Sequence, residues 1–314
     1  MNEIAIRIVA VLLTSLVIAF SAFLFIDYKI TQDKLSTSFI ATQNRIVDGV
    51  GVYLDDFINN NIRQVKIAAD TIASEFGEVD NKEIVKVLKA FAKQGDYLEV
   101  YYGMEDGGFV SSAGVIPAPT KDSSYDPRKS LWYTGGKIKV GYSEPYRTRL
   151  NGESVVTFYA PIIKADKFIG VAGVDVRLDS VIKAMNKMGA GENSYSFISQ
   201  KDSTMLMHPD AKNQGEHLPV MHTIMDKLDS GDIEKDGSVA YEYAGEVKEA
   251  VCRFVGDHGW LLCSSLKKSD KDAAISAPIS TNTMIVVSFL ILFIFVVFVF
   301  LFRLVLFRKS RGKI

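Results

Sequence analysis

Hydrophobic residues collect in two uninterrupted runs, one near each end of the chain. Residues 8–26 and 284–302 are each nineteen residues long and contain no charged side chain. An α-helix rises about 1.5 Å per residue, so each run can cross roughly 28 Å of hydrocarbon. The pattern therefore predicts two transmembrane helices.

A cleaved signal peptide is the alternative interpretation of the first run. Arg7 precedes the run, and the small residues Ser21 and Ala22 lie near its end. However, a signal peptide has an apolar core of about 7 to 15 residues, and no small-x-small cleavage site closes this longer run before Asp27. An uncleaved anchor is therefore favoured.

The charges beside the second run give the orientation. Five basic residues and no acid follow it, whereas its other flank mixes three lysines with two aspartates. The positive-inside rule places such a basic flank in the cytoplasm. We expect residues 1–7 and the basic tail 303–314 to be cytoplasmic, and residues 28–283 to lie outside.

Between the two runs the first pattern is helical. Apolar residues recur at steps of three, four or seven over residues 29–76, and a shorter amphipathic pattern covers 81–93. The period then changes to the alternation of β-strands, with turn residues between the strands. The expected strands are 97–102, 108–111, 138–142, 154–163 and 168–176, and a helix is expected at 178–188.

A smaller set of elements of the same kind follows. The expected elements are strands 195–199 and 205–208, helix 220–228, strands 238–243, 247–255 and 260–266, and a helix 269–283 that runs into the second apolar run. The predicted fold class is α+β. A long N-terminal stalk helix at 28–76 is followed by two modules with antiparallel sheets, at about 77–188 and about 189–268.

Composition excludes several classes of protein. The 314 residues are 48% hydrophobic and 23% charged, with a net charge of −1 and eight prolines, which excludes a disordered tail, a collagen-like fibre and a basic nucleic-acid binder. The mean hydropathy of +0.12 is high for this charge content because of the two terminal runs. Residues 28–283 carry 35 acidic and 30 basic residues, so the exterior region has a net charge of about −5.

Two cysteines in the exterior region have two interpretations. Cys252 and Cys263 flank a segment in which Gly256-Asp257-His258-Gly259 looks like a hairpin turn. If that turn is symmetric, the two cysteines lie directly opposite each other, at cross-strand distance, and an oxidising compartment would preserve a disulfide between them. The alternative is two small thiols buried in the core.

Short catalytic motifs are absent from the sequence. It contains no HExxH, paired CxxC, P-loop, GxSxG or GxGxxG, and its four histidines are dispersed, so we predict no catalytic residue, metal site or cofactor. His208-Pro209-Asp210 is interpreted as a capping turn. The rival hypothesis, a membrane-tethered extracytoplasmic enzyme, would have to use Asp175 or His208 as its acid or base.

Three segments carry a resemblance to a known family. They are DPRKSLWY at 126–133, SEPY at 143–146 and GVAGVDV at 170–176. They resemble the DPR-x-R-x-WY, S-x-PY and G-x-x-G-x-D patterns of double Cache domains, the extracytoplasmic sensors of bacterial chemoreceptors, sensor kinases and diguanylate cyclases. The resemblance covers nearly all of 28–283, with further elements near His208 and Trp260. It implies a stalk helix, a membrane-distal and a membrane-proximal PAS-like module, and a place in the bacterial inner membrane.

The resemblance also implies a ligand site in the distal module. The family's amino-acid sensors use tyrosines, a tryptophan, an arginine and an aspartate, and the matching positions here are Tyr125, Trp132, Tyr133, Tyr146 and Asp175. The arginine, expected two places before the tryptophan, is Ser130 in this chain.

This departure changes the expected ligand. A buried carboxylate and aromatic faces suit an ammonium group. A serine hydroxyl, however, offers neither the charge nor the forked geometry that a ligand carboxylate needs, and Arg128 should point elsewhere. We expect the pocket to favour a small amine, or a ligand whose carboxylate is masked, over a free α-amino acid.

Each of these residues also has a purely structural interpretation. Trp132 and Tyr133 can be core aromatics, and Asp175 can cap the helix that begins near Leu178. Asp126 and Arg128 are assigned to a turn and a local ion pair.

The predicted function is that of a membrane-anchored sensor of small molecules for transmembrane signalling or chemotaxis. The apolar stripe of the stalk helix suggests a parallel homodimer, and the alternative is that the same stripe packs against the chain's own modules. Because the chain ends twelve residues after Phe302, we expect its output to pass through a separate membrane partner, unless the chain is a truncated receptor. A structural partner of another receptor, with a vestigial pocket, is a further alternative.

Overall fold

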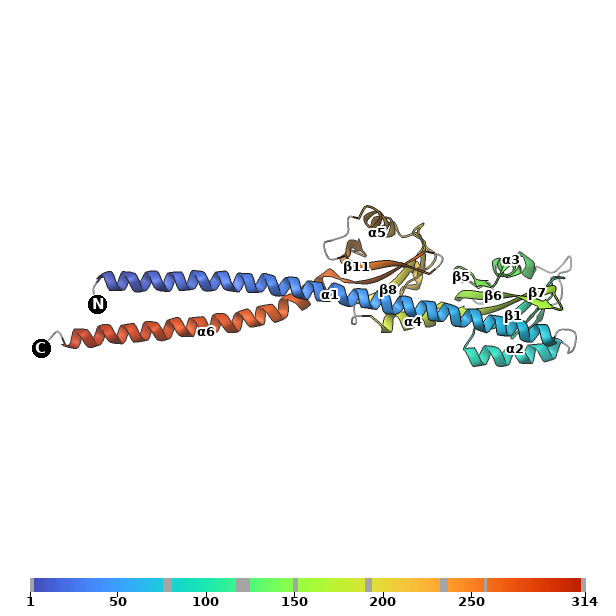
Figure 1. Cartoon of the computed structure of the whole chain (residues 1–314), viewed down its shortest axis with the longest axis horizontal. Coiled ribbons are helices and arrows are strands. Elements are labelled where there is room, and N and C mark those ends of the chain that lie inside the picture. The colour runs from blue at the N-terminus through green and yellow to red at the C-terminus, as the bar shows by residue number, and fades with distance from the viewer. Residues whose placement is uncertain are drawn as a thin grey trace. The chain divides into compact units, whose positions relative to one another are not determined.

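The computed structural model describes residues 3–75, 81–116, 125–148, 152–189, 194–231, 237–256 and 259–311 (Figure 1). The chain divides into two compact units, which are described separately. One unit consists of residues 43–266, and the other combines residues 1–42 with 267–314. Helix α1 (Glu3–Glu75) contributes to both units.

The first part of the unit formed by residues 43–266 is built on a seven-stranded antiparallel sheet. Its strand order is β3-β2-β1-β7-β6-β4, and β5 pairs with another part of β6. The strands are β1 (Glu99–Met104), β2 (Phe109–Ser111), β3 (Gly114–Ile116), β4 (Gly141–Tyr142), β5 (Tyr146–Arg147), β6 (Ser154–Lys164) and β7 (Lys167–Arg177). The helices around it are α2 (Asn81–Gly95), the 3₁₀ turn η1 (Pro127–Lys129), α3 (Leu131–Ile138) and α4 (Leu178–Lys187).

The longest pairing in this sheet is the hairpin of β6 and β7. Lys164 pairs with Lys167 across a two-residue turn, Ala165-Asp166, in which both residues have positive φ, 47° and 62°. Two left-handed residues form the turn whose twist suits paired strands. This hairpin places residues 155–177 in the middle of the sheet.

Side chains alternate between the two faces of the seven-stranded sheet. Val100, Phe158 and Val174 face α1, whose Phe57 ring lies 5.7 Å from the Phe158 ring, edge to face. The opposite face carries Tyr101 and Asp175 and is covered by α3. The candidate site lies on that second face.

A five-stranded antiparallel sheet follows, in the order β10-β11-β12-β8-β9. Its strands are β8 (Ser194–Ser199), β9 (Met205–Met207), β10 (Val239–Tyr243), β11 (Glu246–Val255) and β12 (Trp260–Lys267), and it is accompanied by η2 (Ala211–Asn213) and α5 (Pro219–Asp229). Its core packs Met221 and Ile224 of α5 against Phe197 and Cys263. Two antiparallel sheets behind a long N-terminal helix confirm the predicted fold class.

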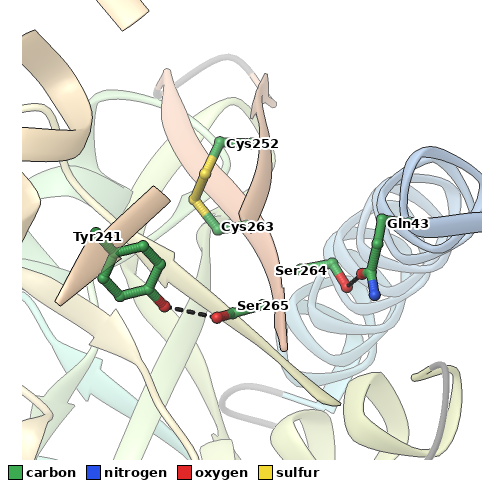
Figure 2. The surroundings of a disulfide bond; sticks show 6 residues. All are labelled: Gln43, Tyr241, Cys252, Cys263, Ser264 and Ser265. Carbon is green, nitrogen blue, oxygen red and sulfur yellow. Dashed lines mark hydrogen bonds between the residues drawn. A yellow bond between two sulfur atoms is a disulfide. The ribbon is translucent and has the colours of Figure 1, made fainter. Parts of the chain in front are cut away.

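A disulfide joins the last two strands, β11 and β12. Cys252 and Cys263 are bonded on the side of the sheet that faces Tyr241 and α5 (Figure 2). The adjacent Ser264 points the other way and donates a hydrogen bond to Gln43 of α1. On the same hairpin, Arg253 pairs with Asp48 of α1. The hairpin therefore has one face in the core and the other on the long helix.

The structure differs from the predicted elements in several segments: strands β3 and β5 and helix α3 were not expected, and the strand predicted at 138–142 is largely absent. A strand was expected at 138–142, but α3 ends at Ile138 and only Gly141–Tyr142 forms a strand. Gly136 explains why a helix fits here, because a Cβ at this position would lie 2.3 Å from Val171 Cγ1. A helix with glycine at that point can lie directly on β7. The predicted turn residues Asp257 and His258, and residues 190–193, lie outside the described residues.

The second unit combines the N-terminal part of α1 with the C-terminal helix of the chain. Helix α6 (Lys268–Arg311) contains the apolar stretch Met284–Val299, and within the described residues one helix, Thr14–Glu75 near the N-terminus, is long and apolar enough to cross a membrane. Its apolar side chains, such as Phe23 and Phe25, are exposed. Where the second span was predicted, at 284–302, the apolar stretch Met284–Val299 is shorter than the length that a membrane-spanning helix needs by the same criterion. The two-pass topology therefore stays a prediction.

We predict that the Cys252–Cys263 bond stabilises residues 43–266. Closing a loop of this length removes unfolded-state entropy worth about 2 to 3 kcal/mol. The double variant Cys252→Ser/Cys263→Ser should lower the free energy of unfolding by about that amount in denaturant titration. Alkylation without reductant should leave the mass of the wild-type chain unchanged. An alkylated wild-type chain would contradict the bond.

Candidate functional site

Asp175 lies in the middle of the seven-stranded sheet and is nearly inaccessible to solvent. It is 5% exposed, on β7, and its cross-strand partners are Glu99 on β1 and Thr157 on β6. Cross-strand pairs project on the same face of a sheet, so the three side chains lie side by side beneath α3. The exposed fraction of Glu99 is 8%. Two buried acids are thus direct neighbours.

Hydroxyl groups bind one oxygen of the Asp175 carboxylate. Tyr101 Oη donates to Oδ1 at 2.7 Å, and Thr157 Oγ1 donates to the same atom at 2.6 Å. Tyr146 Oη lies 2.7 Å from Thr157 Oγ1. Because the Thr157 proton is directed to Asp175, Tyr146 is the donor in that bond. Among the described residues, no group donates to the other oxygen, Oδ2.

Burial sets the electrostatics of this carboxylate. Loss of solvent raises the pKa of Asp175 from 3.8 to about 6, against the lowering effect of the Thr157 and Tyr101 hydrogen bonds, and the charge of Glu99 raises it further. Burial likewise raises the pKa of Glu99, while a hydrogen bond with Ser111 lowers it. The nearest base along β7, Arg177, pairs instead with Glu153, Nε to Oε2 at 2.8 Å. Among the described residues, no basic side chain pairs with Asp175 or Glu99.

The tyrosine hydroxyls at the site remain donors. Burial, followed by the charge of Asp175, holds the pKa of Tyr101 well above 10 and raises that of Tyr146 to about 12. Both phenols are therefore protonated at any physiological pH. The site consequently combines two acids with neutral hydroxyl donors.

Aromatic rings form the wall beside the carboxylate. The Tyr101 ring lies 4.9 Å from that of Trp132 and 5.2 Å from that of Phe109, and Tyr125 packs edge-on against Phe109 at 5.3 Å. Gly173 makes room for this arrangement, because a Cβ there would lie 2.3 Å from the Tyr101 ring. Electron-rich faces next to a carboxylate suit a cation.

The five predicted site residues gather around this sheet face with different roles. Trp132 contacts the ring of Tyr101, which in turn bonds Asp175, and Tyr146 reaches Asp175 through Thr157. Tyr125 stands close enough for the charge of Asp175 to affect its pKa, which burial raises. Tyr133 packs on Trp132 at 5.6 Å, but its hydroxyl donates to the Met104 carbonyl at 3.3 Å.

The structure also tests the purely structural roles that the sequence suggested for Asp175, Asp126 and Arg128. The N-cap of α4 is Arg177, which makes no side-chain cap, so Asp175 does not cap that helix. Arg128 forms a forked ion pair with Asp126, Nε to Oδ1 at 2.9 Å and Nη2 to Oδ2 at 3.0 Å, as assigned from the sequence. Asp126 also accepts from the Arg128 backbone and caps η1. Arg128 is thus engaged away from the carboxylate.

Ser130 lies at the position where an arginine was expected. It is the N-cap of α3 and is half-buried. Its hydroxyl hydrogen-bonds Tyr125, which lowers the pKa of that phenol against the dominant effect of burial. The side chain therefore adds a neutral polar group, and no positive charge, to the site.

Sequence reasoning missed three residues that contact or face Asp175. Tyr101 and Glu99 share one face of β1, and Thr157 is a fully buried polar side chain between Val156 and Phe158 of β6. A polar residue between apolar neighbours in a buried strand is itself a signal of a partner, since buried hydroxyls are hydrogen-bonded. Only the register of β1, β6 and β7 brings the three together.

Comparison with known proteins identifies the family. The sequence profile of the Cache domain matches residues 31–275. The chain belongs to the Cache domain family. This confirms the resemblance drawn from the three sequence segments.

Relatives of this Cache domain protein are chemotaxis receptors. The methyl-accepting chemotaxis protein PscA of Pseudomonas syringae pv. tomato is 27% identical over 228 residues, which cover 68% of this chain and 35% of PscA. McpB of Bacillus subtilis is 22% identical over 280 residues, covering 85% of this chain and 39% of McpB. This Cache domain chain thus spans little more than a third of the length of these relatives.

Solved structures show the same Cache domain fold. The ligand-binding domain of Mlp24 with asparagine matches with a TM-score of 0.58 at 20% identity, covering 78% of this chain and 99% of that one. The ligand-binding domain of the Pseudomonas aeruginosa amino acid chemoreceptor PctB in complex with L-Arg matches with a TM-score of 0.56 at 21% identity, covering 76% and 97%. At these identities the likeness concerns the fold.

We predict that Asp175→Asn stabilises the unliganded protein at neutral pH. The folded carboxyl keeps its proton up to about pH 6, whereas the unfolded one loses it above pH 3.8. Folding therefore takes up a proton in this window, and the free energy of unfolding falls as pH rises through it. Asparagine retains an Oδ1 acceptor and carries no charge, so the variant should gain about 1 to 3 kcal/mol at pH 7.5.

Thermal or denaturant unfolding at pH 4.5 and 7.5 checks this prediction. The gain of Asp175→Asn should shrink at the lower pH. Asp179→Asn, which changes an exposed acid on α4, serves as the control and should show no such difference. A loss of stability at pH 7.5 in Asp175→Asn alone would contradict the proposed cost of burying the carboxylate.

Proposed function

We propose that this chain is a membrane-anchored, extracytoplasmic sensor whose seven-stranded module binds a small amine or amino-acid-like ligand through Asp175. The observation that carries the proposal is the buried carboxylate pair of Asp175 and Glu99, which has no basic partner among the described residues. Buried charges in proteins are paired, because burying an unpaired charge costs several kcal/mol. An ammonium group supplies the missing cation.

The free oxygen of Asp175 supports a specific mode of binding. Oδ1 already accepts from Tyr101 and Thr157, so a ligand ammonium would donate to Oδ2. A charge-assisted hydrogen bond is worth about 1.5 to 3 kcal/mol. The Trp132 and Tyr101 rings add cation–π attraction of about 0.5 to 2 kcal/mol. Together these terms amount to about 2 to 5 kcal/mol, and a dissociation constant of 1 mM corresponds to about 4.1 kcal/mol, so they favour binding of a small cation in the millimolar range.

The surroundings of Ser130 favour a ligand without a free carboxylate. Of the two cationic groups considered for that role, the family's arginine is replaced by Ser130, and Arg128 is held by Asp126. Two acids already occupy the site, and a third carboxylate would be repelled. An amine, an amide or an ester of an amino acid avoids this repulsion.

The names of the similar proteins support signalling as the function of ligand binding. PscA and McpB are chemotaxis proteins by name, and the Mlp24 and PctB domains were solved with amino acids bound. In our proposal, ligand binding stabilises one arrangement of the module and so shifts the position of helices that enter the membrane, within a homodimer and toward a signalling protein in the bacterial inner membrane. Such a shift needs unequal affinity for two states.

We predict that masking the carboxylate of an amino acid improves binding. L-alaninamide and L-alanine share the ammonium and the side chain and differ in charge at the other end. Calorimetry with the full chain in nanodiscs should show L-alaninamide binding about tenfold more tightly or better. Asp175→Asn should abolish this binding, and Asp179→Asn should leave it unchanged. Submillimolar binding of L-alanine without binding of the amide would contradict the proposal.

We further predict that Ser130→Arg reverses this preference. A guanidinium at this position can pair with a ligand carboxylate in forked geometry, and we expect a gain of about tenfold or more in affinity for L-alanine. Ser130→Lys adds the same charge without the fork and should gain less. Unchanged affinity for L-alanine in a folded Ser130→Arg protein would show that position 130 does not face the ligand.

A further inference from the structure

A buried cation lies in the five-stranded sheet, apart from the site described above. Lys248 on β11 is 8% exposed and pairs across the sheet with Tyr241 of β10. Its Nζ donates to Tyr195 Oη at 3.2 Å and lies 4.7 Å from the centroid of the Tyr195 ring and 5.4 Å from that of Tyr243. An ammonium has three donors, and a single neutral acceptor binds one of them. No acid of the described residues forms an ion pair with Lys248.

A second donor faces the same two tyrosines. His208, 6% exposed, lies with its ring centroid 5.3 Å from that of Tyr195 and 6.1 Å from that of Tyr243. Its Nδ1 accepts from the Asp210 backbone N–H at 2.9 Å, which places the proton of the neutral ring on Nε2. Burial lowers the pKa of His208, and Asp210 opposes this effect, so the neutral ring is the relevant form.

The proton on His208 Nε2 has no acceptor among the described residues. The polar atom near Nε2 is Asn213 Nδ2, at 3.5 Å, and this amide is itself a donor to Tyr243 Oη at 2.6 Å. The cluster of Lys248, His208, Tyr195, Tyr243 and Asn213 therefore holds more donors than acceptors. Buried donors in native structures have acceptors, whether from protein, water or ligand.

We propose that Lys248 and His208 form a second binding site, for a small carboxylate, between the Tyr195 and Tyr243 rings. One carboxylate oxygen takes a proton from Lys248 Nζ, and the other takes that of His208 Nε2. Tyr195 and Tyr243 are half-buried, and their rings flank the Lys248 ammonium. Phe197 lies 6.2 Å from His208, ring centroid to ring centroid, and gives the site an apolar side. A carboxylate with a short apolar tail matches this combination better than a fully hydrated anion.

The proposed second site has the opposite charge preference to the first. Asp175 and Glu99 select a cation, whereas Lys248 selects an anion, and a group suited to one site is repelled by the other. The inference stands on contacts within the five-stranded sheet alone. Its test therefore holds whether or not amines bind at Asp175.

The test uses the full chain in nanodiscs and sodium acetate as the probe. Sodium chloride at matched ionic strength is the reference, and inorganic phosphate is the comparison anion. Acetate should raise the thermal unfolding temperature in a saturable manner beyond the effect of chloride. Lys248→Met should weaken the acetate affinity about tenfold or more, and His208→Gln should weaken it by a smaller factor. Lys212→Met, which removes an exposed lysine of the same module, should leave it unchanged.

Two further measurements keep the proposal falsifiable. If Lys248→Met loses its near-ultraviolet circular dichroism, Lys248→Arg replaces it, and this variant should retain acetate binding while the additional change His208→Gln weakens it. An absence of saturable acetate stabilisation in the wild-type protein would overturn the proposal, as would equal stabilisation of folded Lys248→Met. Binding of phosphate without binding of acetate would overturn the assignment to carboxylates.

Discussion

The pairing of two buried carboxylates constrains the rest of the seven-stranded module. The register of β1 and β7 places Glu99 opposite Asp175, and neither has a basic partner among the described residues. Burial and like charge both oppose ionisation, which is why the pKa of Asp175 rises to about 6 despite two hydroxyl donors on Oδ1. Burying this charge without a basic partner lowers the free energy of unfolding of the module. Such a cost is typical of a site that is completed by its ligand.

The surrounding residues position this charge. Gly173 lets the Tyr101 ring lie across β7, and the Tyr101 hydroxyl then reaches Oδ1. Thr157 holds the same oxygen from β6 and ties it to Tyr146 on β5. An ammonium on Oδ2 would favour the ionised carboxylate and so strengthen both of these hydrogen bonds. Because β7 ends at Arg177 and α4 begins at Leu178, a change at Asp175 lies three residues from the helix that leads to the second sheet.

Sequence patterns predicted the fold well because periodicity and turn residues act locally. The long helix, the hairpin of β6 and β7 and the elements of the second sheet follow from apolar spacing. The segment after Ser130 was misread in part because α3 depends on a non-local contact, the close approach of Gly136 to Val171. The site was predicted only in part for the same reason. Asp175 and Trp132 occur in recognisable motifs, whereas Tyr101, Thr157 and Glu99 acquire their roles through strand register.

The hairpin of β11 and β12 gives the second sheet a direct mechanical connection to α1. Lys248 lies on β11, and the disulfide at Cys252 fixes β11 to β12 four residues further along (Figure 2). Ser264 of β12 bonds Gln43 of α1, and Arg253 of β11 pairs with Asp48 of the same helix. A covalently closed hairpin cannot absorb a displacement by fraying between its strands. A carboxylate bound at Lys248 would therefore act on α1 through a rigid element, and the bond would serve transmission as well as stability.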